Sequence, residues 1–185
     1  MLNLEQIDKT WTLFLDRDGV INIDKPNSYV FNPEEFRFYK GVLPSMEMLN
    51  QCFGHIVVVT NQRGVGRGLM TESDLLDIHA KMIREISANG GRIDRIYYCV
   101  TNDNEDPRRK PNPGMAFEAK SDFPDIDFSK SLIIGNNISD MQFGRNAGMK
   151  TVFIKTTMPD IELPNQDIDL AFSSLEDFTK ALHLS

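Results

Sequence analysis

The sequence predicts an α/β fold: a Rossmann-like three-layer sandwich with a mainly parallel sheet and no large cap domain. Two observations lead to this prediction. Short apolar runs of strand length recur along the 185 residues, with helical patterns between them. Several of these runs lack the strict alternation of a half-buried strand, as strands buried on both faces do. Strands that alternate with helices form layered sheets with right-handed crossovers, so we expect a single domain over residues 1–185.

The predicted strands are apolar segments bounded by polar or turn residues. They are Trp11–Leu15, His55–Thr60, Arg95–Val100, Ser131–Gly135, Thr151–Lys155 and Asp169–Phe172. The predicted helices are Leu43–Gln51, Thr71–Asn89, Met115–Lys120 and Asp140–Ala147. The helix over Thr71–Asn89 has the clearest pattern, because Thr71 suits an N-cap and the apolar residues after it recur at helical spacing.

The bulk composition argues against several classes of protein. The net charge of −7 argues against a nucleic-acid partner, which needs a basic surface. The two cysteines, Cys52 and Cys99, provide no disulfide framework. The first ten residues lack the apolar core of a signal peptide, and no apolar run approaches the ~20 residues that span a bilayer. We therefore expect a cytoplasmic protein without a membrane partner.

Polar side chains follow four of the predicted strands. The segments Asp16–Gly19, Thr60–Gln62 and Asn136–Asp140 come directly after strands, and a polar loop ends at Arg109–Pro111. Ligands bind outside the carboxyl ends of the strands in open α/β sheets. The fold would therefore gather acidic, hydroxyl, amide and cationic groups in one crevice.

Asp16 and Asp18 are the first candidates for chemistry. Two carboxylates at alternate positions repel each other unless a cation bridges them or one keeps its proton. A hard cation with oxygen ligands, Mg²⁺ above all, meets this need. One carboxylate could attack phosphorus to form an aspartyl-phosphate, while the other exchanges protons with the leaving group and with water. A strand-end turn with two solvated acids is the alternative for this motif alone.

The later strand ends provide groups that can stabilise a phosphoryl group. Thr60 and Asn61 offer a hydroxyl, an amide and backbone N–H groups. Lys110 could neutralise a transferring phosphoryl group, and Arg109 could bind a second phosphate. Asp140 could bind a metal or pair with Lys110. Taken singly, these residues also fit a surface loop, solvated charges and a helix N-terminal acid.

Three motifs together resemble a known family. The segment Leu13–Asn22 looks like the first motif of haloacid dehalogenase phosphatases. The segments Thr60–Gly68 and Arg109–Met115 resemble, more narrowly, the histidinol phosphatase and D-glycero-D-manno-heptose 1,7-bisphosphate phosphatase subgroup. The resemblance extends over Trp11–Thr156.

This resemblance implies a Mg²⁺-dependent phosphatase of a small sugar phosphate, with the heptose bisphosphate as the best substrate. It implies Asp16 as nucleophile, Asp18 as general acid and base, and Thr60 and Lys110 around the phosphoryl group. The expected substrate-binding residues are Asn61, Gln62, Arg63, Arg109, Asp24, Tyr29 and Asn137. The expected metal ligands are Asp16, Asp18 (through its carbonyl), Asn136 and Asp140.

The sequence departs from the family pattern at two places. Many heptose bisphosphate phosphatases carry a structural zinc before the Arg-Lys-Pro motif, but only Cys99 is kept here. Because structural zinc needs four nitrogen or sulfur ligands, we predict no zinc. The fourth motif normally reads Gly-Asp, whereas this chain has Asn136, which coordinates without a charge. We therefore predict a weakened Mg²⁺ affinity.

Three alternative functions stay open at this point. Histidinol-phosphate phosphatase is the second enzyme candidate, although Arg109 would repel the amine of that substrate. A polynucleotide 3′-phosphatase shares a Thr-Asn-Gln-type second motif, but the acidic charge argues against it. Asn136 also suggests a phosphosugar-binding protein with low activity. The sequence leaves the sugar anomer and the oligomeric state open.

Overall fold

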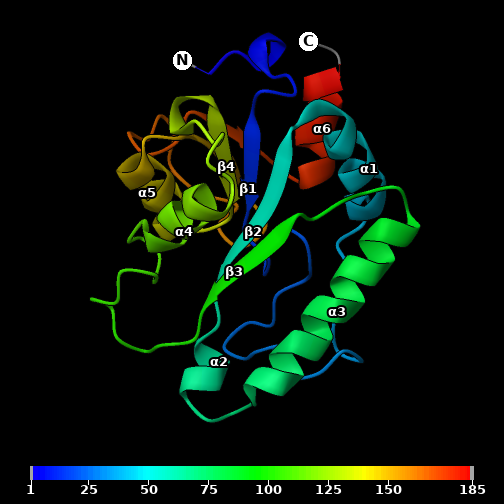
Figure 1. Cartoon of the computed structure of the whole chain (residues 1–185), viewed down its shortest axis with the longest axis vertical. Coiled ribbons are helices and arrows are strands. Elements are labelled where there is room, and N and C mark those ends of the chain that lie inside the picture. The colour runs from blue at the N-terminus through cyan, green and yellow to red at the C-terminus, as the bar shows by residue number, and fades with distance from the viewer. Residues whose placement is uncertain (1, 184–185) are drawn as a thin grey trace.

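Six strands form one sheet in which all neighbours run parallel, as the computed structural model shows for residues 2–183 (Figure 1). The order across the sheet is β3-β2-β1-β4-β5-β6. The strands are β1 (Thr12–Leu15), β2 (His55–Asn61), β3 (Arg95–Cys99), β4 (Ser131–Gly135), β5 (Lys150–Ile154) and β6 (Leu170–Phe172).

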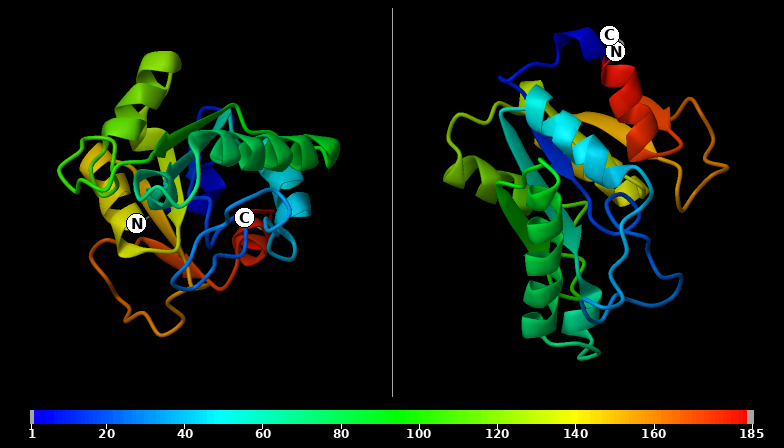
Figure 2. Two further views of the ribbon diagram at one scale, coloured as in Figure 1. Left: turned by 90° about the horizontal axis from the view of Figure 1, so that it is seen from below. Right: turned by 90° about the vertical axis from the view of Figure 1, so that its right-hand side faces the viewer.

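Helices cover both faces of this sheet (Figures 1 and 2). On one face lie α1 (Val42–Cys52), α3 (Glu72–Ala88) and α6 (Leu175–His183). On the other face lie α4 (Gly114–Asp122) and α5 (Ile138–Ala147). A four-residue helix, α2 (Arg63–Gly66), follows β2 directly. Two short 3₁₀ helices span Leu4–Gln6 and Phe128–Lys130.

Successive residues of β1 point into different apolar layers. Leu13 and Leu15 pack in the layer that holds Met46 of α1, whereas Phe14 packs in the opposite layer. The Phe14 ring meets that of Phe143 edge-on, with 6.4 Å between the ring centroids. A strand that is buried on both faces needs apolar residues at every position, which explains the absence of alternation in the sequence.

The structure confirms the predicted fold class and the identity of every predicted element. Each predicted strand is present, with boundaries that differ by one residue at most. In α3, the predicted cap Thr71 accepts a hydrogen bond from the Asp74 N–H, and Asp74 bonds back to the Thr71 N–H. Two helices, α2 and α6, were not predicted from the sequence.

The strand order creates a switch point beside β1. From β1, the chain adds β2 and then β3 toward one edge of the sheet. It then returns to the other side of β1, where β4, β5 and β6 follow toward the opposite edge. Crossover connections therefore diverge between β1 and β4, where a crevice forms at the carboxyl ends of the strands. Loops of residues 16–41, 100–113 and 155–169 surround this edge. No helix of the described chain is long and apolar enough to cross a bilayer.

Candidate active site

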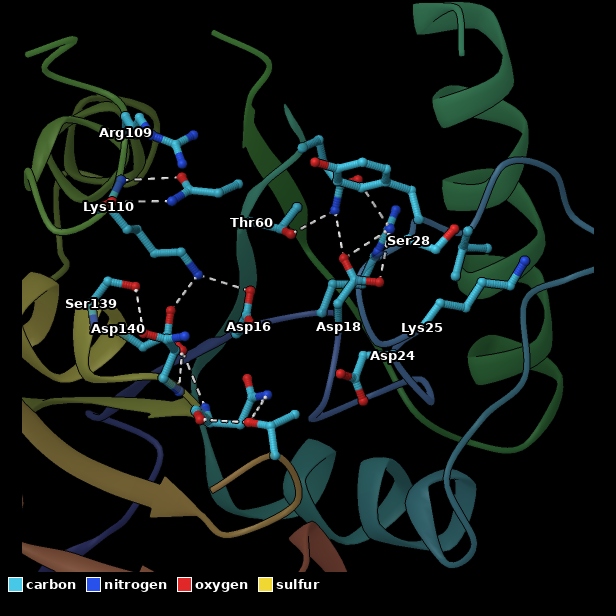
Figure 3. Close-up of a pocket in the computed structure, with 18 residues that line it drawn as sticks. Asp16, Asp18, Asp24, Lys25, Ser28, Thr60, Arg109, Lys110, Ser139 and Asp140 are labelled. Carbon is cyan, nitrogen blue, oxygen red and sulfur yellow. Dashed lines mark hydrogen bonds and ion pairs between the residues drawn. The ribbon is translucent and has the colours of Figure 1, made fainter. Parts of the chain in front are cut away.

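A cavity of about 390 Å³ lies at the carboxyl ends of β1, β2 and β4 (Figure 3). It collects residues from all four polar segments of the sequence. The predicted site residues that line it are Asp16, Asp18, Asp24, Tyr29, Thr60, Asn61, Gln62, Arg109, Lys110, Asn136, Asn137 and Asp140. Arg63 is absent from this lining and lies beside Arg109 at the rim.

Lys110 lies at the centre of the charged groups. Its Nζ is 2.8 Å from Asp16 Oδ1 and 2.7 Å from Asp140 Oδ1, and it donates to the Val59 carbonyl at 2.8 Å. Figure 3 shows the ammonium group between the two carboxylates. Burial lowers the pKa of Lys110, but the carboxylates of Asp140 and Asp16 raise it above its ordinary value. Lys110 is therefore protonated and positively charged although it is buried.

Asp16 is the acid whose charge is least favoured. Burial raises the pKa of Asp16 to about 7, Lys110 opposes this increase, and the carboxylates of Asp140 and Asp18 add to it. A cation beside the free oxygen of Asp16 would oppose the effect of burial and favour the ionised form. The ionised carboxylate is the form that can act as a nucleophile.

Asp18 has the opposite environment. Its carboxylate accepts from Arg17 Nη2 at 2.9 Å, from Asn22 Nδ2 at 2.9 Å and from Gln62 Nε2 at 2.7 Å. Burial alone would raise the pKa of Asp18, but the Arg17 guanidinium and these hydrogen bonds lower it below its usual value. Asp18 is thus ionised and held in place, and it can donate a proton only after it has first taken one up.

The amide side chains of Asn61 and Gln62, at the end of β2, hold other protein groups. The Asn61 side chain donates to the Lys110 carbonyl and accepts from the Lys110 N–H, both at 3.1 Å. Gln62 Nε2 donates to Thr60 Oγ1 at 2.9 Å as well as to Asp18, and its Oε1 accepts from Arg17. Both were expected to bind substrate. Their polar atoms make positioning contacts within the protein, and both residues line the cavity. Their contact with substrate stays a prediction.

Asp140 uses both of its carboxylate oxygens in contacts within the protein. One oxygen pairs with Lys110, and the other accepts from the N–H groups of Asn136 and Asn137 at 3.1 and 3.0 Å. The contact to the Asn137 N–H forms part of a capping box at the start of α5, in which the Asn137 side chain accepts from the Asp140 N–H. The Asn137 side chain also accepts from Ser139 N at 3.2 Å. Between the two interpretations of Asp140, this geometry favours the Lys110 partner over the metal ligand.

Oxygen atoms converge on one side of the Asn136 side chain. The amide atom on that side lies 3.0 Å from the Asp18 carbonyl oxygen and 3.2 Å from Asp16 Oδ2. Gly19, with φ of 88°, leaves room for this amide, because a Cβ there would lie 1.9 Å from it. Oxygen ligands that include a carboxylate and a carbonyl are the set that Mg²⁺ prefers. The residues present therefore fit Mg²⁺.

This metal set contains few carboxylates. Among residues 2–183, there is no cluster of three or more His, Cys, Asp or Glu side chains that could hold a metal ion. The candidate ligands are instead Asp16, the Asp18 carbonyl and Asn136. The lower negative charge agrees with the predicted weaker Mg²⁺ affinity, which stays a prediction.

Arginines gather at the rim of the cavity. Arg109 Nη1 donates to the Thr101 carbonyl at 3.1 Å, and Arg109 and Arg63 both donate to Asn104 Oδ1, at 3.3 and 2.7 Å. Burial lowers the pKa of Arg109, and the positive charges of Arg63 and Arg67 add to this decrease. In the described chain, these three arginines pair with no carboxylate, unlike the arginines at positions 17, 92, 95, 108 and 145. Arg109 lines the cavity, and the charges of Arg63 and Arg67 act on it, so the three are here called the arginine rim.

The loop after β1 covers another side of the cavity. Asp24 and Tyr29, both predicted to contact substrate, line it. Lys25 and Ser28 also line it, and Figure 3 shows them beside Asp24. The Tyr39 hydroxyl donates to Asp24 Oδ1 at 3.2 Å. The roles of Asp24 and Tyr29 in substrate binding stay predictions.

Sequence reasoning missed several residues that support the site. Arg17 is only 1 % exposed, and its Nη1 lies 3.2 Å from His79 Nε2. Burial and the Arg17 charge lower the pKa of His79 to about 3, against the effect of Asp18. A neutral His79 can accept from Arg17. Asn104 and Thr157 were also missed, and a polar residue in a loop gives no sequence signal for such contacts.

Comparisons with known proteins agree with this site. The HAD-hydrolase-like family matches residues 107–178. A heptose-1,7-bisphosphate 7-phosphatase of the D-glycero-α-D-manno form, from Campylobacter jejuni, is 40% identical over 146 residues, covering 79% of this chain and 83% of that protein. The D-glycero-β-D-manno-heptose-1,7-bisphosphate 7-phosphatase of Photorhabdus laumondii is 35% identical over 179 residues, covering 92% and 94%.

Solved structures show the same similarity. The D,D-heptose 1,7-bisphosphate phosphatase of B. bronchiseptica, crystallised with magnesium and phosphate, superposes with a TM-score of 0.83 and 30% identity. The match covers 94% of this chain and 98% of that one. This chain belongs to the D-glycero-D-manno-heptose-1,7-bisphosphate 7-phosphatase family of HAD-like hydrolases.

The Lys110→Met variant tests the buried charge cluster. It leaves Asp16 and Asp140 buried without their cation, so we expect the free energy of unfolding at pH 8 to fall by roughly 3–5 kcal/mol. Urea unfolding measures this change. The control is Lys180→Met, which removes an exposed lysine from its i,i+4 ion pair with Glu176. Its free energy of unfolding should fall by about 0.5 kcal/mol or less. Equal losses in the two variants would contradict the central role of Lys110.

The His79→Gln variant tests the neutral state of His79. The folded pKa of about 3 lies below the ordinary value of 6.5, so the unfolded chain binds more protons between these two pH values. This contribution to stability is present above pH 6.5 and is lost as the pH falls. Between pH 7 and 5, wild type should lose about 2 kcal/mol relative to His79→Gln. Parallel pH profiles of unfolding free energy would show that His79 is not held neutral.

Proposed function

We propose that residues 1–185 form one phosphatase domain that hydrolyses D-glycero-D-manno-heptose 1,7-bisphosphate through an aspartyl-phosphate on Asp16. The observation that carries this proposal is the placement of Asp16 between a buried cation and an oxygen cluster. Lys110 holds one oxygen of Asp16, and the other faces the Asp18 carbonyl and Asn136. The family membership supports the same reaction. The cytoplasmic location stays a prediction.

In the first step, the Asp16 carboxylate attacks phosphorus. A bond forms between the carboxylate oxygen and phosphorus, and the bond from phosphorus to the sugar oxygen breaks. Asp18, once it holds a proton, gives it to the departing alkoxide. Lys110 and the Thr60 hydroxyl provide positive charge and a hydrogen bond for the phosphoryl oxygens.

In the second step, water attacks the aspartyl-phosphate. The Asp18 carboxylate takes a proton from this water, the bond between phosphorus and Asp16 breaks, and phosphate leaves. The contacts from Arg17, Asn22 and Gln62 favour the ionised Asp18 that this step needs. The same contacts must weaken when Asp18 carries its proton.

Asp16, the Asp18 carbonyl and the Asn136 side chain would hold Mg²⁺. When bound, the ion neutralises negative charge on Asp16 and on the phosphoryl oxygens. A relative in the same family is described with magnesium and phosphate, which supports this assignment. Because Asn136 brings no charge where the family pattern has an aspartate, a higher Mg²⁺ concentration is needed to fill this site.

The arginine rim supports a substrate with a second phosphate. Arg109 lies at the cavity wall, and Arg63 and Arg67 add positive charge without carboxylate partners in the described chain. The buried Nε of Arg63 has no hydrogen-bond partner among the described residues. Planar guanidinium groups bind phosphate through paired hydrogen bonds. This arrangement disfavours histidinol phosphate, whose amine is cationic.

The low-activity alternative has one observation in its favour, which is Asn136. Against it, the nucleophile, its lysine and the Asp18 contacts are all assembled in one cavity. No described feature favours a polynucleotide 3′-phosphatase.

Phosphate release tests the proposed reaction. We expect turnover of heptose 1,7-bisphosphate that requires Mg²⁺ and falls at least about a thousandfold in Asp16→Asn, because no other group there can form the covalent intermediate. The substrates to compare are the two anomers of the heptose bisphosphate, histidinol phosphate and an aryl phosphate. Turnover that survives in a folded Asp16→Asn variant would contradict the mechanism. Turnover fastest on histidinol phosphate would contradict the substrate.

Arg63→Met and Arg67→Met test the second phosphate. Loss of a charge-assisted contact should lower kcat/KM for the bisphosphate by about ten- to a hundredfold, with a smaller decrease for the aryl phosphate. The control is Arg95→Met, because Arg95 pairs with Asp122 away from the cavity. An equal decrease on both substrates would show that the arginine rim does not recognise a second phosphate.

A further inference from the structure

The Asn136 side chain lies between two different environments. It is only 6 % exposed. On one side are the Asp18 carbonyl oxygen and Asp16 Oδ2, at 3.0 and 3.2 Å, and on the other side is the Thr157 hydroxyl, at 2.9 Å. The first side offers only hydrogen-bond acceptors, whereas a hydroxyl can both donate and accept. An amide therefore fits this place in either of two orientations, related by half a turn, in which its contacts differ.

In the first orientation, the amide oxygen faces the acceptor side. Nδ2 then donates to Thr157 Oγ1, and the Thr157 hydroxyl donates to the main-chain oxygen of Asn136 at 3.0 Å. The amide oxygen, the Asp18 carbonyl and Asp16 Oδ2 converge without a proton between them. Only a cation makes such a group of oxygens favourable. This is the metal-ready orientation.

In the second orientation, the amide nitrogen faces the acceptor side. Nδ2 donates to the Asp18 carbonyl at 3.0 Å and to Asp16 Oδ2 at 3.2 Å, and Oδ1 accepts from Thr157 Oγ1 at 2.9 Å. The amide protons then occupy the position of the cation and neutralise the repulsion between the oxygens. This is the metal-free orientation.

We propose that the Asn136 amide is a two-position switch for the metal site, and that Thr157 is the positioning residue that favours its metal-ready orientation. This inference rests on the proposed function, because it concerns the same Mg²⁺ site. An aspartate at this position could not act in this way, since a carboxylate has no proton to place between Asp16 and Asp18. The switch is therefore a consequence of the asparagine.

Thr157 favours one orientation because its hydroxyl has a single proton. In the metal-ready orientation, the hydroxyl accepts from Nδ2 and donates to the main-chain oxygen of Asn136, so it makes two hydrogen bonds. In the metal-free orientation, the one proton is divided between Oδ1 and that main-chain oxygen. Thr157 lies in the exposed loop after β5, so replacing it leaves the core intact.

Nuclear magnetic resonance detects the orientation directly. We expect a nuclear Overhauser effect between the Asn136 side-chain NH₂ and the Thr157 methyl group that is strong with saturating Mg²⁺ and weak with a chelator. The Asn136→Ala variant identifies the NH₂ resonances. An effect of equal strength in both conditions would overturn the switch.

The Mg²⁺ affinity, measured by calorimetry, tests whether Thr157 favours the metal-ready orientation of Asn136. Thr157→Val should weaken binding about two- to tenfold, the size expected for one neutral hydrogen bond, and Thr157→Ser should restore it. In the Asn136→Asp background, Thr157→Val should change the affinity by less than about twofold, because both carboxylate oxygens are acceptors in either state. Equal effects in the two backgrounds, or no Mg²⁺ binding by wild type, would overturn the proposal.

These measurements need no substrate. An enzyme that shows the expected Thr157 dependence but releases no phosphate would leave the switch standing and would contradict the proposed function. An enzyme that turns over substrate with Mg²⁺ but shows no change in the Asn136 amide would contradict the switch alone.

Discussion

The ion pairs of Lys110 are the interaction on which the rest of the site depends. A buried ammonium group between Asp16 and Asp140 joins the end of β1 to the start of α5, and its bond to the Val59 carbonyl adds β2. Burying these charges has a desolvation cost that only close, hydrogen-bonded geometry offsets. Asn61 contributes to that geometry by holding the backbone of Lys110 on both its N–H and its carbonyl. The cavity is therefore arranged around a cation that cannot move without leaving carboxylates unpaired.

Two carboxylates only two residues apart have opposite electrostatic environments. Burial raises the pKa of Asp16, whereas Arg17 and its neighbours outweigh burial and lower the pKa of Asp18. Environments that separate the pKa values of two acids also separate their chemical roles. Asp16 faces the oxygen cluster where a cation belongs, and Asp18 is kept ionised by amide and guanidinium donors. These opposite environments agree with the proposed division between nucleophile and proton carrier.

The site also combines an acidic chain with a local cluster of positive charge. The chain carries a net charge of −7, yet Arg63, Arg67 and Arg109 form a local positive rim with no carboxylate partner in the described chain. Within the cavity, Asn136 places an uncharged amide beside Asp16 Oδ2 and the Asp18 carbonyl oxygen, and its NH₂ group can donate hydrogen bonds to both. An amide at this position therefore differs from a carboxylate in both its charge and its ability to donate hydrogen bonds to those oxygens.

The sequence by itself determined the layered α/β fold and the principal charged groups of the cavity. Apolar runs and helix caps act over a few residues, and parallel strands bring their carboxyl ends to one edge, so Asp16, Thr60, Lys110 and Asn136 could be expected together. Only the tertiary structure decided how each group is used. Gln62 and Asn61 hold Asp18 and Lys110, Arg17 is buried against His79, and Thr157 reaches Asn136. Most of these contacts join residues tens of positions apart, and local periodicity carries no information about such pairs.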